Sequence, residues 1–228
     1  MDSLREKVVL ITGASRGIGR ETARLFSTGG AKLVLCSREG KELQEVASET
    51  GALAVPCDVS DEEDVRELFV RIEQSFGRLD VVVSNAGVFR TVPLIETTAD
   101  IFDETIRVNL RAVFLVAREA LRLMSRTGGG VIINVSSMAG KEGFEGSAAY
   151  CASKFGVVGL SRVLAIEGRP HGVRVTVLYP GAVDTAIWDG IADDREGFLK
   201  PHDVARAILY AASSSPESSV GEIEITPL

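Results

Sequence analysis

The segment 148–160 (AAYCASKFGVVGL) carries two strong hydrogen-bonding side chains in a stretch that is otherwise small or apolar. Tyr150 and Lys154 are four residues apart, which puts both side chains on one face of a helix, one turn from each other. A free phenol has a pKa of about 10, too high for a group that must donate and accept protons near neutrality. An ammonium group one turn away stabilises the phenolate and lowers that pKa. The pair is therefore a candidate acid–base centre, although this spacing is a weak signal by itself.

Short apolar, β-branched runs alternate with amphipathic stretches along the chain. The runs expected to form strands are 7–12, 32–37, 52–57, 79–84, 130–136, 173–179 and 221–226. The stretches expected to form helices are 17–29, 39–50, 61–76, 98–126, 148–168 and 201–213. The first six runs do not alternate cleanly between apolar and polar residues, which is typical of strands covered on both faces. We therefore predict an α/β fold: a doubly wound parallel sheet of the Rossmann type with about seven strands and helices on both faces.

Composition and charge limit which domain organisation and which partners are possible. With 228 residues, the chain is predicted to be a single domain, with a cofactor half at 1–125 and a catalytic and substrate half at 126–228. A net charge of −7 argues against a nucleic-acid or anionic-membrane surface. Cys36, Cys57 and Cys151 have neither CxxC spacing nor a nearby His cluster, and the first residues hold too short an apolar run for a signal peptide. We expect free thiols, no metal site and a cytoplasmic location.

A glycine-rich turn, TGASRGIG, follows the first expected strand and opens the first expected helix. Gly13, Gly17 and Gly19 allow a tight turn, close approach of backbone N–H groups to a pyrophosphate, and close packing of helix on strand. The N-terminus of the helix adds a partial positive charge. A plain βα turn would not require three glycines, so a dinucleotide site is the favoured interpretation.

The spacing G-x-x-x-G-x-G, with further motifs in the same order along almost the whole chain, resembles the short-chain dehydrogenases/reductases in their compact branch. The family's T-G-x-x-x-G-x-G motif is matched from Thr12 to Gly19, its N-A-G motif by 85–87 and its P-G-x-V-x-T motif by 180–185. The resemblance implies a nicotinamide dinucleotide cofactor. The residues that it implies for cofactor binding are Gly13, Ser15, Arg16, Gly17, Ile18, Gly19, Ser37, Arg38, Asp58, Val59, Asn85, Ala86, Gly87, Tyr150, Lys154, Pro180, Gly181, Val183 and Thr185.

The resemblance also implies a catalytic tetrad. The family's serine lies thirteen residues before its tyrosine, which selects Ser137 and leaves Ser136 with a structural or capping role. Ser137 would hold and polarise the substrate oxygen, Tyr150 would act as general acid/base, and Lys154 would also bind the nicotinamide ribose. Asn109, in IRVNLRAVF, would hold a water of the proton relay. The alternative for Asn109 is a mid-helix asparagine that only hydrogen-bonds within its own segment.

Two arginines favour NADP(H) over NAD(H). In NAD-dependent relatives of this fold an acidic residue at the end of the second strand binds the ribose hydroxyls, but Ser37 holds that place, with Arg38 next to it. A guanidinium suits the 2′-phosphate of NADP, and Arg16 lies within the glycine turn. Two solvated surface arginines are the alternative.

The substrate is expected between Tyr150 and the loops after the fourth, fifth and sixth strands. The candidate contacts are Met138, Phe144 and Trp188, together with Val88, Phe89, Tyr179 and Ile187. Their apolar character favours a hydrophobic ketone or aldehyde, including a 3-ketoacyl compound. A lid at 186–200 is short, so we expect an open pocket, and the tail GEIEITPL lacks the Asp-Gly-Gly ending of many members.

The main hypothesis is an NADP(H)-dependent oxidoreductase that interconverts a carbonyl and an alcohol by hydride transfer. A catalytically silent NADP(H)-binding regulatory protein is the alternative. The apolar content of the expected helices 98–126 and 148–168, and their usual pairing in the family, predict a homodimer or homotetramer. A small molecule is expected as the other partner, with no nucleic acid and no membrane.

Overall fold

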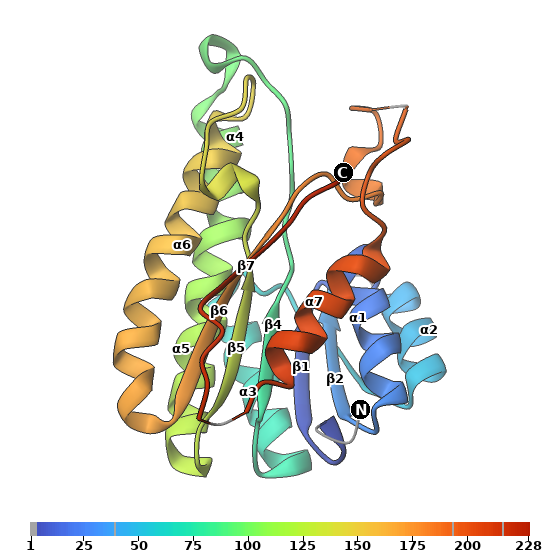
Figure 1. Cartoon of the computed structure of the whole chain (residues 1–228), viewed down its shortest axis with the longest axis vertical. Coiled ribbons are helices and arrows are strands. Elements are labelled where there is room, and N and C mark those ends of the chain that lie inside the picture. Colours follow the sequence, from blue (N-terminus) through green and yellow to red (C-terminus); the bar gives the residue numbers. More distant parts are fainter. Residues whose placement is uncertain (1–3, 39, 193, 216) are drawn as a thin grey trace.

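The computed structural model describes residues 4–38, 40–192, 194–215 and 217–228, which form a seven-stranded sheet between two layers of helices (Figure 1). The strands are β1 (Val8–Thr12), β2 (Lys32–Ser37), β3 (Leu53–Pro56), β4 (Val81–Ser84), β5 (Gly130–Val135), β6 (Val173–Pro180) and β7 (Glu222–Ile225). Their order is β3-β2-β1-β4-β5-β6-β7, and every neighbouring pair is parallel. The predicted Rossmann-type fold is confirmed. The order reverses between β1 and β4, which is where such sheets open a crevice for ligands.

The helices cover both faces of the sheet. They are α1 (Gly17–Thr28), α2 (Gly40–Thr50), α3 (Glu62–Phe76), α4 (Ala99–Ile106), α5 (Ala112–Thr127), α6 (Ala148–Gly168) and α7 (Pro201–Ala212). Side chains of α1, α2 and α7 share one apolar core with the sheet, and side chains of α3, α5 and α6 share the other. All residues of β1 and β4 are buried, which explains why these runs do not alternate between apolar and polar residues. The helix expected at 39–50 starts at Gly40 among the described residues, and Glu39 lies outside them.

The helix expected at 98–126 is not one uniform α-helix. Thr98 caps α4, and a π-helical turn, η3 (Arg107–Arg111), joins α4 to α5. A π turn inserts one extra residue into the helical ladder and is frequent at functional sites. Here the turn is centred on Asn109, whose side chain bonds to the loop after β4. Sequence periodicity could not reveal this insertion, because the bonds that hold it come from a distant segment.

Helix α6 is the longest helix and carries Tyr150 and Lys154 near its start. The helical stretch Ala148–His171 is long and apolar enough to cross a membrane by length and composition alone. In the fold this helix packs against β6, α4 and the short helix η4 (Met138–Gly140). It thus forms part of the core and holds its first turns against the carboxyl ends of the strands.

Two loops form a wall beyond the carboxyl ends of the strands. The loop after β4 and the loop between η4 and α6 run together, and the N–H of Val92 donates to the carbonyl of Gly146 at 2.8 Å. In Figure 1 these loops rise on the side of α4 and α6, while the segment 186–200 and the C-terminal residues lie on the side of α1. The short helix η6 (Ala186–Trp188) begins that second segment, of which Asp193 is outside the described residues.

Candidate functional site

A cavity of about 680 Å³ lies at the carboxyl ends of the central strands. It is lined by most of the side chains that the sequence singled out, from the glycine turn at one end to Met138, Phe144 and Trp188 at the other. Of the predicted cofactor-binding and catalytic residues, Gly19 and Asn109 do not line it and lie behind its wall. The cavity thus joins the expected dinucleotide site and the expected catalytic residues in one space.

The N-terminus of α1 faces this cavity without a side-chain cap. Arg16 is the N-cap residue, its side chain makes no capping bond, and no acidic residue lies in the first turn. In contrast, Asp61 caps α3 by accepting from the N–H groups of Glu63 and Asp64. The free N–H groups and positive end of α1 fit a pyrophosphate, with Gly17 held at a φ of 55° beside them.

The glycine turn is braced by the segment after β4. The Asn85 amide donates to the carbonyls of Thr12 (3.1 Å) and Gly13 (3.2 Å). The Thr12 hydroxyl accepts from the N–H groups of Asn85 and Ala86. The N-A-G segment therefore holds the turn in shape as well as lining the cavity.

Gly19 serves close packing, because a Cβ there would lie 2.3 Å from the Gly13 carbonyl oxygen. We expect Gly19→Ala to push α1 away from the turn, to lower the free energy of unfolding by about 1–3 kcal/mol and to weaken dinucleotide binding. Gly159→Ala is the control, since that helical glycine in α6 has no atom within 4 Å of an added Cβ. Thermal unfolding and cofactor titration of both variants check this, and equal melting temperatures for the two would contradict it.

Asp58 and its neighbours form the far end of the cavity. The Asp58 carboxylate accepts from the N–H (3.0 Å) and hydroxyl (2.7 Å) of Ser60, and Arg107 lies 3.6 Å from it. Burial acts to raise the pKa of Asp58, but the Ser60 hydrogen bonds and the charges of Arg107 and Arg38 outweigh it, so the pKa lies below its ordinary value. Asp58 is therefore an ionised acceptor aimed at this end of the cavity.

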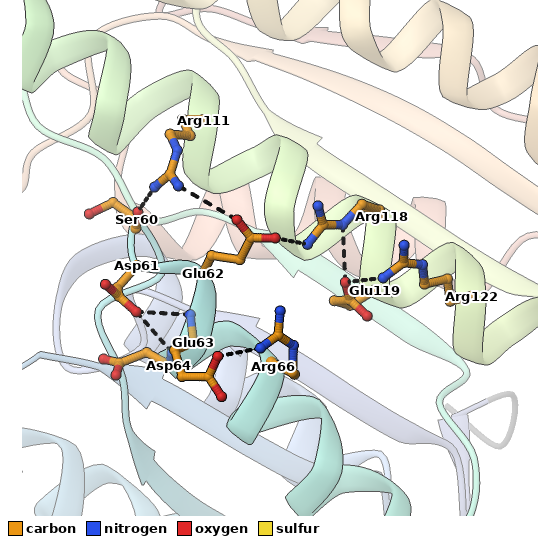
Figure 2. Close-up of polar contacts among 10 residues, drawn as sticks. All are labelled: Ser60, Asp61, Glu62, Glu63, Asp64, Arg66, Arg111, Arg118, Glu119 and Arg122. Carbon is orange, nitrogen blue, oxygen red and sulfur yellow. Dashed lines mark hydrogen bonds and ion pairs between the residues drawn. The ribbon is translucent and has the colours of Figure 1, made fainter.

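An ion-pair network between the start of α3 and the helical segment formed by η3 and α5 fixes the loop that holds Asp58. Figure 2 shows Arg111 donating to the Ser60 carbonyl and lying beside Glu62, which also accepts from Arg118 at 2.7 Å. Arg107 donates to the Ser60 hydroxyl. Arg107 was not predicted from the sequence, because its contacts with Asp58 and Ser60 depend on how distant segments pack.

Ser137, Tyr150 and Lys154 converge at the other end of the cavity. Ser137 is the N-cap of η4, where its hydroxyl accepts from the N–H of Ala139, and it also hydrogen-bonds Tyr150. The Nζ of Lys154 lies 5.5 Å from the centre of the Tyr150 ring and donates to the carbonyl of Val135 at 3.0 Å. Ser136 is buried and donates to the carbonyl of Lys154, a structural contact of the kind expected for it.

Burial dominates the pKa values of the pair. It raises the pKa of Tyr150 to about 12, although the hydrogen bond from Ser137 acts in the opposite direction. It lowers the pKa of Lys154 to about 8. The direction for Tyr150 is opposite to the one expected from the sequence. The chain's own groups thus favour the protonated phenol, and a nearby positive charge would lower this pKa.

Asn109 is fully buried and connects three segments. Its Oδ1 accepts from the N–H of Val88 at 2.8 Å, and its Nδ2 donates to the carbonyl of Val88 and to the hydroxyl of Ser153. Asn109 thus ties the loop after β4 to α6, so its bonds reach beyond its own segment. Gly87 leaves room here, since a Cβ would lie 3.3 Å from Asn109 Oδ1 and 3.9 Å from Lys154 Nζ.

A row of aromatic rings closes the substrate end. Phe89 contacts Tyr150 edge-on with ring centres 4.7 Å apart, Trp188 contacts Phe89 at 5.1 Å, and Phe198 contacts Trp188 at 5.3 Å. The segment 186–200 therefore reaches across the site, although it is short. One indole thus joins this segment to the loop after β4, and the open pocket expected from the sequence stays a prediction.

The other expected substrate residues divide into two groups. Val88, Met138, Phe144 and Ile187 line the cavity with Phe89 and Trp188. Tyr179 does not line it: this ring is buried, and Lys141 Nζ lies 4.3 Å from its centre on the side of β7. Residues that were not predicted from the sequence also line the cavity, among them Glu142, Glu145, Thr226 and Pro227. The place of Pro227 could not be predicted from the sequence, because it depends on the register of β7 on β6, which brings Pro227 next to Gly181.

Comparisons with known proteins agree with this arrangement. The family model described as short chain dehydrogenase matches residues 7–196. An uncharacterized oxidoreductase of Staphylococcus aureus (strain USA300) is 36% identical over 231 aligned residues that cover 100% of both chains. The uncharacterized oxidoreductase YxjF of Bacillus subtilis (strain 168) is 39% identical over 189 residues, covering 81% of this chain and 74% of YxjF. A crystal structure of a short-chain type dehydrogenase/reductase from Mycobacterium marinum has a TM-score of 0.93 at 31% identity, covering 98% of this chain and 95% of that one. The chain therefore belongs to the short-chain dehydrogenase/reductase family of oxidoreductases, which use a nicotinamide dinucleotide.

Proposed function

We propose that the protein is an NADP(H)-dependent oxidoreductase that interconverts an apolar ketone or aldehyde and the corresponding alcohol. The observation that carries the proposal is the single cavity shared by the uncapped N-terminus of α1 and by Ser137, Tyr150 and Lys154. The bound dinucleotide supplies the hydride and, in its oxidised form, a positive charge near the phenol. The glycine turn, Asp58 and the segments 85–87 and 180–185 would hold it.

In carbonyl reduction the chain's own residues would position the oxygen and deliver the proton. The Ser137 hydroxyl donates a hydrogen bond to the substrate oxygen, and the Tyr150 O–H gives its proton to the developing alkoxide. The positive charge of Lys154 stabilises the phenolate that remains. Asn109 keeps the loop after β4 in place, and the family resemblance gives it a water of the proton relay.

The lysine and tyrosine pKa values give an expected pH profile. Because the pKa of Lys154 is lowered to about 8, its ammonium loses the proton as pH rises through that value, while Tyr150 stays protonated up to about pH 12. We expect kcat/KM for carbonyl reduction to fall above about pH 8, as the phenolate loses its stabilising charge. Lys154→Arg, which stays charged, should move the fall to higher pH. A profile that is flat across this range, or a fall unchanged in the variant, would contradict the role given to Lys154.

Arg16 and Arg38 support NADP(H) as the form of the cofactor. Both are exposed and both line the cavity, on either side of the strand ends that would receive the adenosine. Arg38 also contributes its charge to the field at Asp58. Two guanidinium groups at this end suit a terminal phosphate better than two free ribose hydroxyls.

The silent-regulator alternative predicts tight NADPH binding without turnover. Consumption of NADPH, followed by absorbance with a panel of diketones, quinones, aldehydes and 3-ketoacyl thioesters, separates the two hypotheses. We expect turnover with at least one apolar member of the panel. Tight NADPH binding with no turnover on the whole panel would favour the regulator.

A homo-oligomer and a cytoplasmic location complete the proposal. Large apolar side chains are exposed on α4, α5 and α6, among them Phe102, Phe114, Phe155 and Ile166. These helices are the ones that the sequence assigned to a dimer or tetramer, and members of this family typically oligomerise. The three cysteines are buried and unpaired, which fits a reducing compartment.

A further inference from the structure

We propose that the substrate end of the cavity selects carbonyl compounds by charge, binding neutral or cationic aromatic carbonyls in preference to anionic ones. The proposal rests on the oxidoreductase function proposed above and names the substrate class of the same site. Glu142 and Glu145 would be the specificity-determining residues. Neither has a role in the family resemblance that led to the catalytic residues.

The charges along the cavity are segregated. Among the described residues that line it, Arg16, Arg38 and Asp58 lie at one end of the cavity, near the N-terminus of α1 and the ends of β2 and β3. Glu142 and Glu145 lie in the loop between η4 and α6. The cofactor end therefore carries the guanidinium groups that suit phosphates. The substrate end carries two carboxylates.

The two carboxylates are not neutralised by neighbouring cations. Glu142 and Glu145 are exposed, and neither side chain forms a hydrogen bond or ion pair with another described residue. Lys141, next in the chain to Glu142, is paired with Glu224 at 2.6 Å and lies over Tyr179. Arg90, next to Phe89, is paired with Glu104 at 2.8 Å. Glu142 and Glu145 form the rim of the substrate end, and this rim thus keeps its negative charge.

The cations nearest to the reacting groups do not offset this rim. Lys154 is 5% exposed and donates to Val135 beneath Tyr150, so its charge acts on the reacting oxygen and not on a distant substituent. Arg195, in the segment that faces the rim, is paired with Asp189 at 2.6 Å and lies 3.5 Å from Asp184. The segment 186–200 adds further acidic side chains at its exposed surface.

The carboxylates are held beside aromatic rings. The bond from Val92 to Gly146 fixes the loop that carries Glu145, and a Cβ at Gly146 would lie 2.7 Å from Thr91 Cγ2, so the two loops touch. Phe89, Phe144 and Trp188 line the same end of the cavity. Aromatic faces with nearby carboxylates bind organic cations well and repel organic anions. Thioesters on polyanionic carriers are thereby disfavoured relative to small neutral ketones.

The test uses three aryl ketones that differ only in their para substituent: methyl, trimethylammonium and carboxylate. We measure kcat/KM with NADPH and, separately, the dissociation constant of each ketone from the protein–NADPH complex. Trp188 is the one tryptophan of the chain and lines the cavity, so its fluorescence reports binding whether or not turnover occurs. We expect the trimethylammonium ketone to exceed the carboxylate by roughly 30- to 100-fold in both measurements at low salt, with the methyl ketone between them.

Charge-neutral variants assign the effect to the two glutamates. In Glu142→Gln/Glu145→Gln the ratio between cationic and anionic ketone should fall to about threefold or less. The control, Glu45→Gln/Glu67→Gln, removes the same net charge from exposed positions on α2 and α3 outside the cavity and should keep the wild-type ratio. Raised salt should reduce the wild-type ratio, because the rim is open to solvent.

The outcomes separate this inference from the proposed function. If the trimethylammonium ketone bound most tightly and the carboxylate most weakly, without turnover of any of them, this would support charge selection and count against the reductase. Turnover of all three ketones at similar kcat/KM, no binding of any of them, or an unchanged ratio in the Glu142/Glu145 variant would overturn charge selection. Only the panel and Tyr150 experiments then bear on the reductase itself.

Discussion

Tyr150→Phe should lower kcat for carbonyl reduction by roughly 100- to 10,000-fold, the range expected when a general acid is removed. The change deletes one hydroxyl and keeps the ring, so the contact with Phe89 and the packing of α6 should persist. NADPH affinity should change little, because Lys154 and the glycine turn are untouched. Single-turnover rates and NADPH titrations by Trp188 fluorescence measure the two effects separately.

Tyr210→Phe is the matched control for this experiment. Tyr210 is exposed on α7 and outside the cavity, so the loss of its hydroxyl should leave kcat unchanged. If Tyr150→Phe kept wild-type kcat on a substrate of the native enzyme, the acid–base assignment would be wrong. A large loss of NADPH binding in the variant would instead give Tyr150 a structural role.

A change of cofactor preference is the second large effect expected. Ser37→Asp with Arg38→Leu removes a guanidinium from the adenosine end and adds a carboxylate, which repels a 2′-phosphate and accepts from free ribose hydroxyls. A hydrogen bond to a charged group contributes about 1.5–3 kcal/mol, and the double change removes one such bond to NADPH and adds one to NADH. We therefore expect the ratio of kcat/KM for NADPH over NADH to fall by roughly 100- to 10,000-fold.

The control for this change is Arg206→Leu, which removes an exposed arginine on α7 that does not line the cavity. It should leave the preference unaltered. The added variant Arg16→Leu distinguishes the two guanidinium groups: if both contact the phosphate, it should weaken NADPH binding and leave NADH binding nearly unchanged. An NADPH preference that survived the double change at 37 and 38 would refute the assignment.

Much of the fold follows from local features of the sequence. Each apolar run became a strand within a few residues, because strands covered on both faces need continuous apolar segments, as the fully buried β1 and β4 show. The glycine turn and the first helix were also readable, since a φ of 64° at Gly13 and 55° at Gly17 demands glycine. The π turn at Asn109 was not readable, because side-chain bonds to Val88 hold it.

The candidate site divides in the same way. Tyr150 and Lys154 were predicted from their spacing, Ser137 from the family resemblance, and Arg16 and Arg38 from their place after strands, and all of them line the cavity. Arg107, Pro227 and the two glutamates of the rim were missed, because their importance comes from what lies opposite them. The role of Asp58 follows from both sequence and structure. Its place after β3 suggested a ligand contact, and its contacts with Ser60 and Arg107 explain why it stays ionised.

By itself the sequence determined the parallel sheet, the dinucleotide turn and one helical turn between a phenol and an ammonium, because strand burial, glycine conformation and helix period are local properties. The tertiary structure decided the rest. Burial raised the pKa of Tyr150 and lowered that of Lys154, against the local expectation. The contact of Trp188 with Phe89 joined the segment 186–200 to the loop after β4, and the paired loops placed Glu142 and Glu145 along the cavity. These properties depend on the solvent and charges around each group, which are set by segments far apart in the chain.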